Sequence, residues 1–204
     1  MHLSKPYSAL SPSVDLEVLV ELARSTKTRS GREVSRRIGR AWGGVGPVLE
    51  RLVEQGLVER DEVGATYVFA LNREHLLASL VEELAGLRIT FFDRLRELMA
   101  GWESQPLHAS VFGSMARGDG DTSSDIDLFL VRPKQVDLED ETWRQQLDEL
   151  SNRVRAWTGN STSLIEVGFN ELDELRRQRR SVLEEISSDA IDLAGKKARQ
   201  VIGK

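Results

Sequence analysis

The spacing of hydrophobic residues predicts short helices followed by strands in the first third of the chain. Apolar residues recur every three or four positions in three successive segments: 14–26, 28–41 and 42–56. Ser30 is an expected N-cap, with Glu33 completing a capping box, and Gly56 is an expected C-cap of the third helix. Residues 57–72 then alternate as strands do, with a turn near Gly64, so they predict a two-stranded hairpin.

The rest of the chain alternates longer helices with short apolar strands. Residues 73–102 repeat large apolar residues at helical spacing, which predicts a long helix that Gly86 either leaves intact, kinks or divides. Strands are predicted in three apolar runs: 107–114, 125–131 and 160–169. A helix is predicted over 138–159, and residues 170–195 predict a last helix and a closing turn. The pattern as a whole predicts an α+β fold.

Composition and charge narrow the possible kinds of site. The 204 residues contain no cysteine, which excludes disulfides, thiolate metal sites and cysteine nucleophiles. The sequence offers no signal peptide and no membrane span, so we expect a cytoplasmic protein without a membrane partner. The net charge is −5, yet the segment from Arg24 to Arg40 is strongly basic. This basic segment is either a solvated helix surface or a binding surface for a polyanion.

The order of three helices and a hairpin is that of a winged helix. Residues 43–72 resemble the recognition helix and wing of bacterial transcription regulators, which usually bind DNA as dimers. The resemblance implies DNA as a partner and a homodimer. The arginines expected to contact DNA lie beside or on the predicted helix-turn-helix: Arg32, Arg36, Arg37, Arg40 and Arg51. Because the third helix begins with few side chains able to read bases, weak specificity or a role in dimerisation stays open.

The stretch "VFGSMARGDGDTSSDIDLFLV", residues 111–131, places two acids in an otherwise apolar strand. Buried carboxylates are costly unless positive charge lies close to them. Alternate residues of a strand point to the same face, so Asp125 and Asp127 are expected to project side by side. Hard oxygen ligands of this kind suit Mg²⁺, which leaves room for water and phosphate. The sequence therefore predicts a Mg²⁺ site at these two aspartates.

The spacing of residues in this stretch resembles the signature of the nucleotidyltransferase fold of the DNA polymerase beta superfamily. The positions that match are Gly113, Ser114, Arg117, Gly118, Ser124, Asp125, Asp127 and Leu128. In size, the C-terminal half is similar to the minimal nucleotidyltransferases, small bacterial proteins related to antitoxins. The resemblance implies an NTP substrate, with ATP the expected one, and metal-binding catalytic residues at Asp125 and Asp127. Gly113, Ser114 and Ser124 are expected to bind the nucleotide, whereas Arg117 either binds phosphate or anchors the loop.

A third carboxylate is expected on a later strand in this family. Glu166 is the one acid in the strand predicted over 160–169, so it is the candidate third catalytic and metal-binding residue. The acid more often lies earlier in the strand, near Ser161 or Ser163, so catalysis is either complete through Glu166 or weak. The arginine-rich run 176–180 is either a solvated helix surface or a contact for a nucleotide, nucleic acid or toxin.

These predictions divide the chain into four segments. We expect a flexible tail over 1–13, a winged-helix DNA-binding domain over 14–72, a connecting helix over 73–104, and a nucleotidyltransferase α/β domain with a short mixed sheet over 105–204. The leading hypothesis is a DNA-binding regulator that transfers AMP to a hydroxyl of a protein or small molecule. A second hypothesis makes the nucleotidyltransferase domain a weakly active nucleotide sensor or a dimerisation module, and a third makes the chain an antitoxin with a toxin as its partner.

Overall fold

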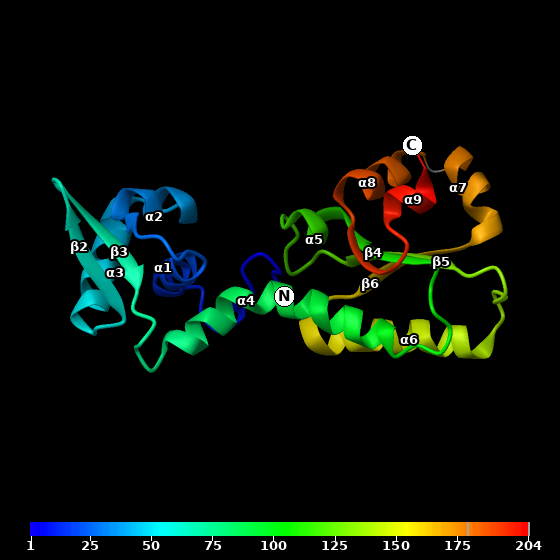
Figure 1. Cartoon of the computed structure of the whole chain (residues 1–204), viewed down its shortest axis with the longest axis horizontal. Helices are drawn as coiled ribbons and strands as arrows, with labels where there is room; N and C mark the ends of the chain where they lie inside the picture. The colour runs from blue at the N-terminus through cyan, green and yellow to red at the C-terminus, as the bar shows by residue number, and fades with distance from the viewer. Residues whose placement is uncertain (179, 204) are drawn as a thin grey trace. The chain divides into compact units, whose positions relative to one another are not determined.

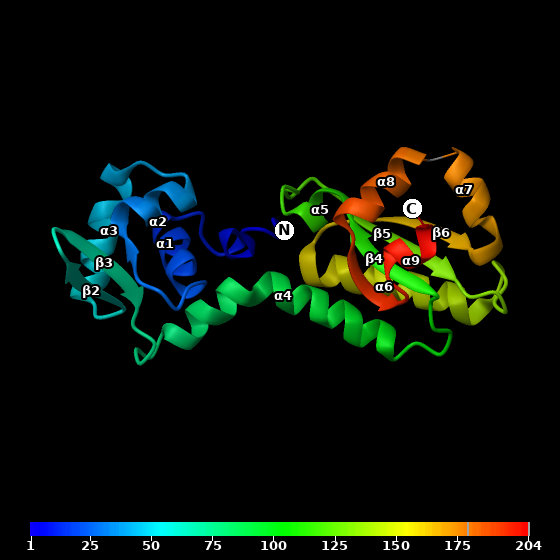
Figure 2. The same cartoon turned by 45° about the horizontal axis from the view of Figure 1, so that its top comes forward.

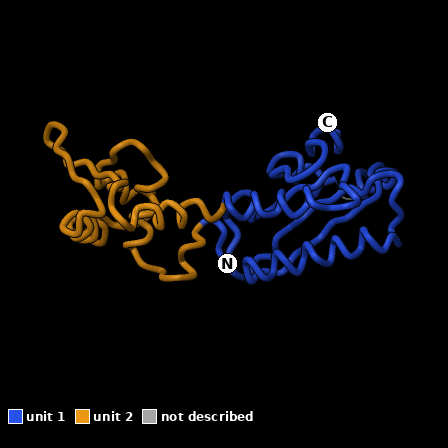
Figure 3. Tube along the Cα trace, turned by 60° about the horizontal axis from the view of Figure 1, so that its bottom comes forward, with its two compact units in different colours: residues 1–4, 89–204 blue, residues 5–88 orange. Residues whose placement is uncertain are grey.

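The chain forms two compact units, coloured separately in Figure 3. The computed structural model describes residues 1–178 and 180–203. One unit comprises Lys5–Arg88, and the other comprises Met1–Ser4 and Ile89–Lys204. The helix α4 (Ala78–Ala100) runs without interruption through Gly86 and contributes residues to both units. The helix predicted over 73–102 is therefore present as one continuous, slightly shorter element.

The unit of residues 5–88 contains the predicted helices and hairpin together with one additional short strand. Its elements before α4 are η1 (Pro6–Ala9), α1 (Val14–Ala23), β1 (Arg29–Ser30), α2 (Gly31–Ile38), α3 (Trp42–Glu54), β2 (Val58–Val63) and β3 (Thr66–Leu71). The three strands form an antiparallel sheet in the order β1-β3-β2. The Ser30 side chain accepts a hydrogen bond from the Glu33 N–H, as expected of an N-cap, so α2 begins where the sequence predicts.

The helices of this unit are joined by one apolar core. Val18 and Leu22 of α1, Val34 of α2, Leu49 of α3 and Phe69 of β3 are buried against one another. The spacing of apolar residues in the sequence places each of these side chains on the inward side of its helix or strand. Burial of these side chains, each contributing about 1.5–3 kcal/mol, fixes the three helices relative to the hairpin.

Residues 1–13 were expected to form a flexible tail, and the structure corrects this prediction. Leu3 is fully buried in the apolar core of the C-terminal unit, and the terminal amine donates a hydrogen bond of 2.8 Å to the Thr158 carbonyl. Tyr7, in η1, is buried in the other unit. The burial of Leu3 and Tyr7 could not be predicted from this polar, proline-containing sequence, because single buried side chains leave no periodic pattern.

The C-terminal unit is built around a four-stranded mixed sheet. After α4 its elements are β4 (His108–Phe112), α5 (Gly113–Arg117), β5 (Ile126–Arg132), α6 (Glu141–Thr158), β6 (Thr162–Gly168), η2 (Phe169–Glu171), α7 (Leu172–Gln178), α8 (Arg180–Asp189), β7 (Ile191–Gly195) and α9 (Ala198–Ile202). The strand order is β6-β5-β4-β7, with β5 and β6 parallel and the other neighbours antiparallel. The prediction of a last helix and closing turn was wrong in detail, because residues 191–195 form the edge strand β7.

Helices cover both faces of this sheet (Figures 1 and 2). The two faces have separate apolar cores. Leu128 and Leu130 of β5 pack on the side of α6, where Trp143 is fully buried. Phe129 and Val131 point to the opposite side and pack with residues of α8 and α9. Since neighbouring residues of a strand point to opposite faces, this division assigns every residue of β5 to one side or the other.

Within the part of the chain that the structure describes, no helix is both long and apolar enough to span a membrane.

Candidate functional site

Asp127 lies on the α8 side of the sheet, close to the beginning of β5. It is opposite Phe112 in β4 and opposite Ser163 in β6, and its side chain is about half buried. Gly113 follows Phe112 with a φ of 70°, a conformation that favours glycine. A Cβ atom at Gly113 would lie 2.5 Å from Oδ2 of Asp127, so only glycine lets the backbone approach this carboxylate so closely.

The surroundings of Asp127 disfavour its negative charge. Burial raises the pKa of its carboxyl group, and the nearby charges of Glu185 and Asp125 raise it further. A hydrogen bond from Ser163 and the charge of Arg117 act in the opposite direction. Neither Asp125 nor Asp127 forms an ion pair with any residue in the described ranges 1–178 and 180–203. Within the described residues, no cationic side chain is thus paired with these two neighbouring carboxylates.

The loop before Asp125 is held by residues that the signature does not contain. The Asn160 side-chain amide, almost fully buried, donates hydrogen bonds to the carbonyl oxygens of Asp121 and Ser124. The Ser124 hydroxyl lies 3.0 Å from the Asp121 N–H and 3.2 Å from the Asp121 carboxylate. Ser124, expected to bind nucleotide, is therefore engaged in shaping the turn that leads into Asp125.

Arg117 joins the signature loop to α8. Its guanidinium lies 2.6 Å from Glu185, 2.9 Å from Asp189 and 3.3 Å from Asp119. Hydrogen bonds to Asp189, Glu185 and Asp119 raise the pKa of Arg117 above its usual range. Of the two roles open for Arg117, these contacts favour anchoring the loop, because its Nε and Nη1 already donate to carboxylates. Glu185 is consequently held at a position where its charge acts on Asp127.

Glu166 does not lie with the two aspartates, which corrects the prediction of a third carboxylate. It is opposite Leu130 in the parallel pair of β5 and β6, so it points to the α6 side of the sheet, whereas Asp127 points to the α8 side. Its carboxylate accepts hydrogen bonds from Arg132 at 2.7 Å and from the Trp143 indole at 3.3 Å. Burial raises the pKa of Glu166 and the charge of Arg132 lowers it.

The residue that occupies the early position on β6 is a serine. Ser163 lies directly opposite Asp127 and hydrogen-bonds to its carboxylate. Within residues 1–178 and 180–203, no three histidine, aspartate or glutamate side chains are grouped closely enough to form a metal site. Asp125 and Asp127 still fit a magnesium ion. Mg²⁺ prefers hard oxygen ligands, and one or two carboxylates are enough when water and phosphate oxygens complete its coordination shell.

Three of the five arginines expected to contact DNA are paired within their own unit. Arg40 donates to both oxygens of Glu17, at 2.7 and 3.1 Å. Arg37 lies 3.2 Å from Glu33 and 3.5 Å from Glu21, and Arg51 pairs with Asp15. Arg32 and Arg36 are exposed and form no ion pair with any residue that the structure describes. Three of the five arginines expected to contact DNA are therefore balanced by acids of their own unit.

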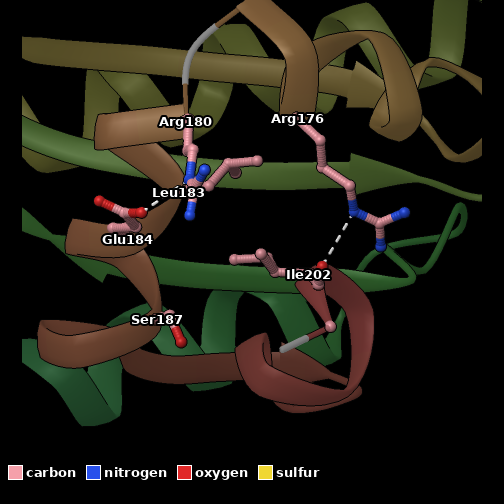
Figure 4. A pocket seen from close by; sticks show the side chains of 7 residues that line it. Arg176, Arg180, Leu183, Glu184, Ser187 and Ile202 are labelled. Carbon is pink, nitrogen blue, oxygen red and sulfur yellow. Dashed lines mark hydrogen bonds and ion pairs between the residues drawn. The ribbon is translucent and has the colours of Figure 1, made fainter.

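Two residues of the arginine-rich run, Arg176 and Arg180, border a hollow of about 620 Å³ among α7, α8 and α9 (Figure 4). Arg176 donates hydrogen bonds to the carbonyl oxygens of Val201 and Ile202, and Arg180 lies 2.9 Å from Glu184. Arg179 lies outside the described residues. The Arg176 guanidinium is thus held by contacts within its unit, whereas the Arg180 side chain remains 85% exposed.

Comparison with known proteins identifies the C-terminal domain. Residues 98–192 match the family model described as "Polymerase beta, Nucleotidyltransferase". No curated protein matches the chain. A solved toxin–antitoxin complex with AMP-PNP is 16% identical, over 54% of this chain and 80% of the other, with a TM-score of 0.38. A mutant of the toxin–antitoxin pair MntA–HpeT is 13% identical over the same shares, 54% and 80%, with a TM-score of 0.39.

The mixed sheet and the loop between β4 and β5 define a nucleotidyltransferase domain. Residues 98–192 form a domain of the polymerase beta nucleotidyltransferase family, which confirms the resemblance drawn from the signature that begins at Gly113. The match lies outside Lys5–Arg88, so it identifies the C-terminal unit alone.

Proposed function

We propose that the C-terminal unit binds a Mg²⁺-bound nucleoside triphosphate, with ATP as the expected substrate, and transfers its nucleotidyl group to a hydroxyl of a protein or small molecule. The observation that supports this most directly is the state of Asp127. Its carboxylate is half buried beside Gly113, and no cation of the described residues is paired with it. Carboxylates whose negative charge is disfavoured by their surroundings cluster at functional sites, where a bound ligand can supply the compensating positive charge.

Each residue of the site has a distinct role in this proposal. Asp125 and Asp127 hold the metal, whose charge offsets that of the triphosphate. Gly113 allows the backbone to approach the phosphates, and the Ser114 hydroxyl binds a phosphate oxygen. In the reaction, the acceptor oxygen forms a bond to the α-phosphorus while the bond from that phosphorus to pyrophosphate breaks, and the hydroxyl proton passes to water.

Arg117 and Ser124 act through position in the same proposal. Arg117 holds α8 against the loop through Glu185 and Asp189, and Ser124 shapes the turn before Asp125. Glu166 stabilises the opposite side of the sheet through Arg132 and takes no part in metal binding.

A second function is favoured by the residue opposite Asp127. Ser163 cannot supply a third negative charge, and the charge of Glu185 is shared with Arg117. Fewer carboxylates bind a catalytic metal less tightly. The domain would then be a nucleotide sensor that binds Mg²⁺-nucleotide with slow transfer or none, and it would change the affinity of the chain for DNA.

For the N-terminal unit we propose a winged helix that binds nucleic acid. The order α1, α2, α3 followed by the β2–β3 hairpin supports this, as do the exposed Arg32 and Arg36, which form no ion pair among the described residues. A homodimer, a cytoplasmic location and a toxin as protein acceptor belong to the same proposal. Copurification of a protein partner, or its absence, tests the antitoxin form of the hypothesis.

The test of transfer uses the purified chain with Mg²⁺, α-labelled ATP and a lysate of its own cells. We expect label to pass to an acceptor with the wild-type protein and with Glu166→Gln, but not with Asp127→Asn. Equal labelling by wild type and Asp127→Asn would contradict the proposal. Absence of label from a protein that still binds Mg²⁺-nucleotide would replace transfer with the sensor function, which then requires a nucleotide-dependent change in DNA affinity.

A further inference from the structure

Trp42, the first residue of α3, is an exposed aromatic side chain whose position is fixed by glycine contacts. A Cβ atom at Gly31 would lie 2.3 Å from Cζ3 of the indole, and one at Gly46 would lie 3.1 Å from Cζ2. The six-membered ring therefore packs directly on the backbone of α2 and α3. Even so, 49% of the residue remains exposed. Two glycines thus hold a large apolar ring at the surface instead of burying it.

The surface beside Trp42 consists of backbone with almost no side chains. Gly43 and Gly44 have open space where a Cβ would be, and neither has a positive φ. Glycine inside a helix costs about 1 kcal/mol relative to alanine, and nothing within the unit requires it at these two positions. Pro47, one turn further, is exposed and has no N–H. This part of α3 has no side chain that could read the edge of a base pair.

Two exposed arginines of α2 follow the glycine that contacts Trp42. Arg32 comes directly after Gly31, and Arg36 lies one turn beyond Arg32, on the same side of the helix as Arg32. Both are exposed, and neither is paired with an acid among the described residues. The hairpin, which would be the wing, is acidic in β2, where Glu59, Asp61 and Glu62 accompany one arginine. Phosphates are therefore attracted to the α2 side and repelled by the hairpin.

We propose that Trp42 is a stacking platform for an unpaired base of a nucleic-acid strand, with Arg32 and Arg36 holding the phosphates on either side. Aromatic rings beside cations are the usual means of binding single strands without reading their sequence. Gly43 and Gly44 allow the sugar–phosphate backbone to approach closely. This inference rests on the proposal that the N-terminal unit binds nucleic acid, and it is independent of nucleotidyl transfer.

A protein partner fits this surface less well. A stable protein interface buries about 800 Å² on each side around several large apolar side chains. Along this part of α3, the exposed residues after Trp42 are Gly43, Gly44 and Pro47, so Trp42 has too few large apolar neighbours there to form the centre of such an interface.

The test measures the affinity of the full-length chain for fluorescein-labelled oligothymidine and oligouridine of about 16 nucleotides, the upper end of single-strand site sizes, and for a duplex of equal length. Trp42→Ala should weaken single-strand binding about 5- to 100-fold, the range expected for loss of one stacked base. Gly31→Ala, which retains the indole but displaces it, should weaken binding in the same direction. Tyr67→Ala is the matched control, because Tyr67 is 51% exposed but lies in the acidic hairpin.

A second variant examines charge without disturbing the packing of Trp42. Arg32→Gln with Arg36→Gln should reduce the slope of log affinity against log salt concentration by about 1.4, since each phosphate contact to a single strand contributes about 0.7. The relative affinities of oligothymidine and oligouridine identify DNA or RNA as the ligand.

Two results would overturn the inference. If the duplex binds at least as tightly as the single strand and Trp42→Ala changes neither affinity, the stacking platform is wrong while nucleic-acid binding by the unit stands. If the folded wild-type chain binds none of the three probes, both this inference and the proposed nucleic-acid function of the unit fail.

Discussion

The sequence marks two groups of charges as functional: the arginines of the N-terminal unit and the aspartates at the start of β5. Three of the five arginines differ from both aspartates in their ion pairing. Arg37, Arg40 and Arg51 are paired with acids of their own unit. Asp125 and Asp127 are left without a paired cation, and burial disfavours the charge of Asp127. The paired arginines are explained by their contribution to stability. The charge of Asp127 lowers stability, so a bound ligand is needed to explain it.

The largest effect should come from closing the space that Gly113 leaves beside Asp127. Gly113→Ala adds a Cβ atom 2.5 Å from Oδ2 of Asp127, and it places a side chain at a φ of 70°. We expect nucleotidyl transfer to fall more than about 100-fold, since displacement of a catalytic group by about 1 Å can have that effect. The measurement is the initial rate of label transfer per folded molecule.

Gly56→Ala is the matched control for this change. Gly56 has a similar φ of 75° but nothing within 4 Å of the added Cβ. It should lower the free energy of unfolding by about 1–2 kcal/mol through backbone strain, with transfer per folded molecule unchanged. Equal loss of transfer in the two variants would show that strain alone, and not contact with Asp127, explains the first result.

The next largest effect should show that residues on the two faces of the sheet have different roles. Glu166→Gln removes one partner of an ion pair whose side chains are 12% and 7% exposed, for Glu166 and Arg132 respectively. The variant should lower the free energy of unfolding by about 3 kcal/mol, because Arg132 loses its charged partner. Denaturant unfolding measures this, and the metal affinity of the folded protein should remain at the wild-type value. A large loss of metal affinity would return Glu166 to the metal site.

The paired and unpaired arginines should differ in what their removal changes. Arg40→Gln leaves Glu17 without its bidentate partner, so it should lower the midpoint of thermal unfolding without altering the salt dependence of nucleic-acid binding. Arg32→Gln should do the reverse, because Arg32 has no ion pair among the described residues to lose. If both variants reduce the salt slope equally, pairing with Glu17 does not remove Arg40 from the binding surface.

The smallest expected effect is on the pH dependence of stability, to which Glu17 and Asp127 contribute with opposite signs. Hydrogen bonding from Arg40 lowers the pKa of Glu17 below 4.5, so its contribution is complete above 4.5 and is lost as pH falls through the lowered pKa. Burial raises the pKa of Asp127 above 3.8, so its ionised form costs stability at neutral pH, and that cost disappears as pH falls through the raised pKa.

Two variants measure this contrast. Near neutral pH and without metal, Glu17→Gln should unfold a few degrees below the wild type, and Asp127→Asn a few degrees above it. Both differences should shrink on acidification, which thermal unfolding across neutral to acidic pH would reveal. An Asp127→Asn protein less stable than wild type at neutral pH would contradict the view that this carboxylate is kept at a cost.

The sequence predicted the elements with long periodic patterns and missed those that depend on tertiary contacts. The helices, the hairpin and the strands that contain Val111, Leu128 and Leu164 follow from local spacing. The edge strand β7 has only five residues, and its pairing with β4 is long-range. Leu3 becomes buried because of the core around it, which no local pattern shows.

The sequence predicted those residues of the candidate site that lie in one local motif. Gly113, Asp125 and Asp127 all lie within the short stretch 113–127, and the structure brings Gly113 close to Asp127. The side of the sheet that Glu166 faces depends on the register of β5 with β6, which the sequence does not reveal. The roles of Asn160 and Glu185 depend on contacts across 36 and 68 residues of sequence, and neither residue carries a recognisable local signal.

The central claim is that Asp125 and Asp127 are left unpaired in order to bind a metal together with a nucleotide. Calorimetric titration of the full-length chain with AMP-PNP, in the presence and absence of Mg²⁺, tests it most directly. The wild type should bind nucleotide only with Mg²⁺, and the variant with Asp125→Asn and Asp127→Asn should bind at least about 100-fold more weakly, because even the partners behind metal ligands contribute about 10- to 100-fold. Equal, metal-independent binding by the two proteins would contradict the claim.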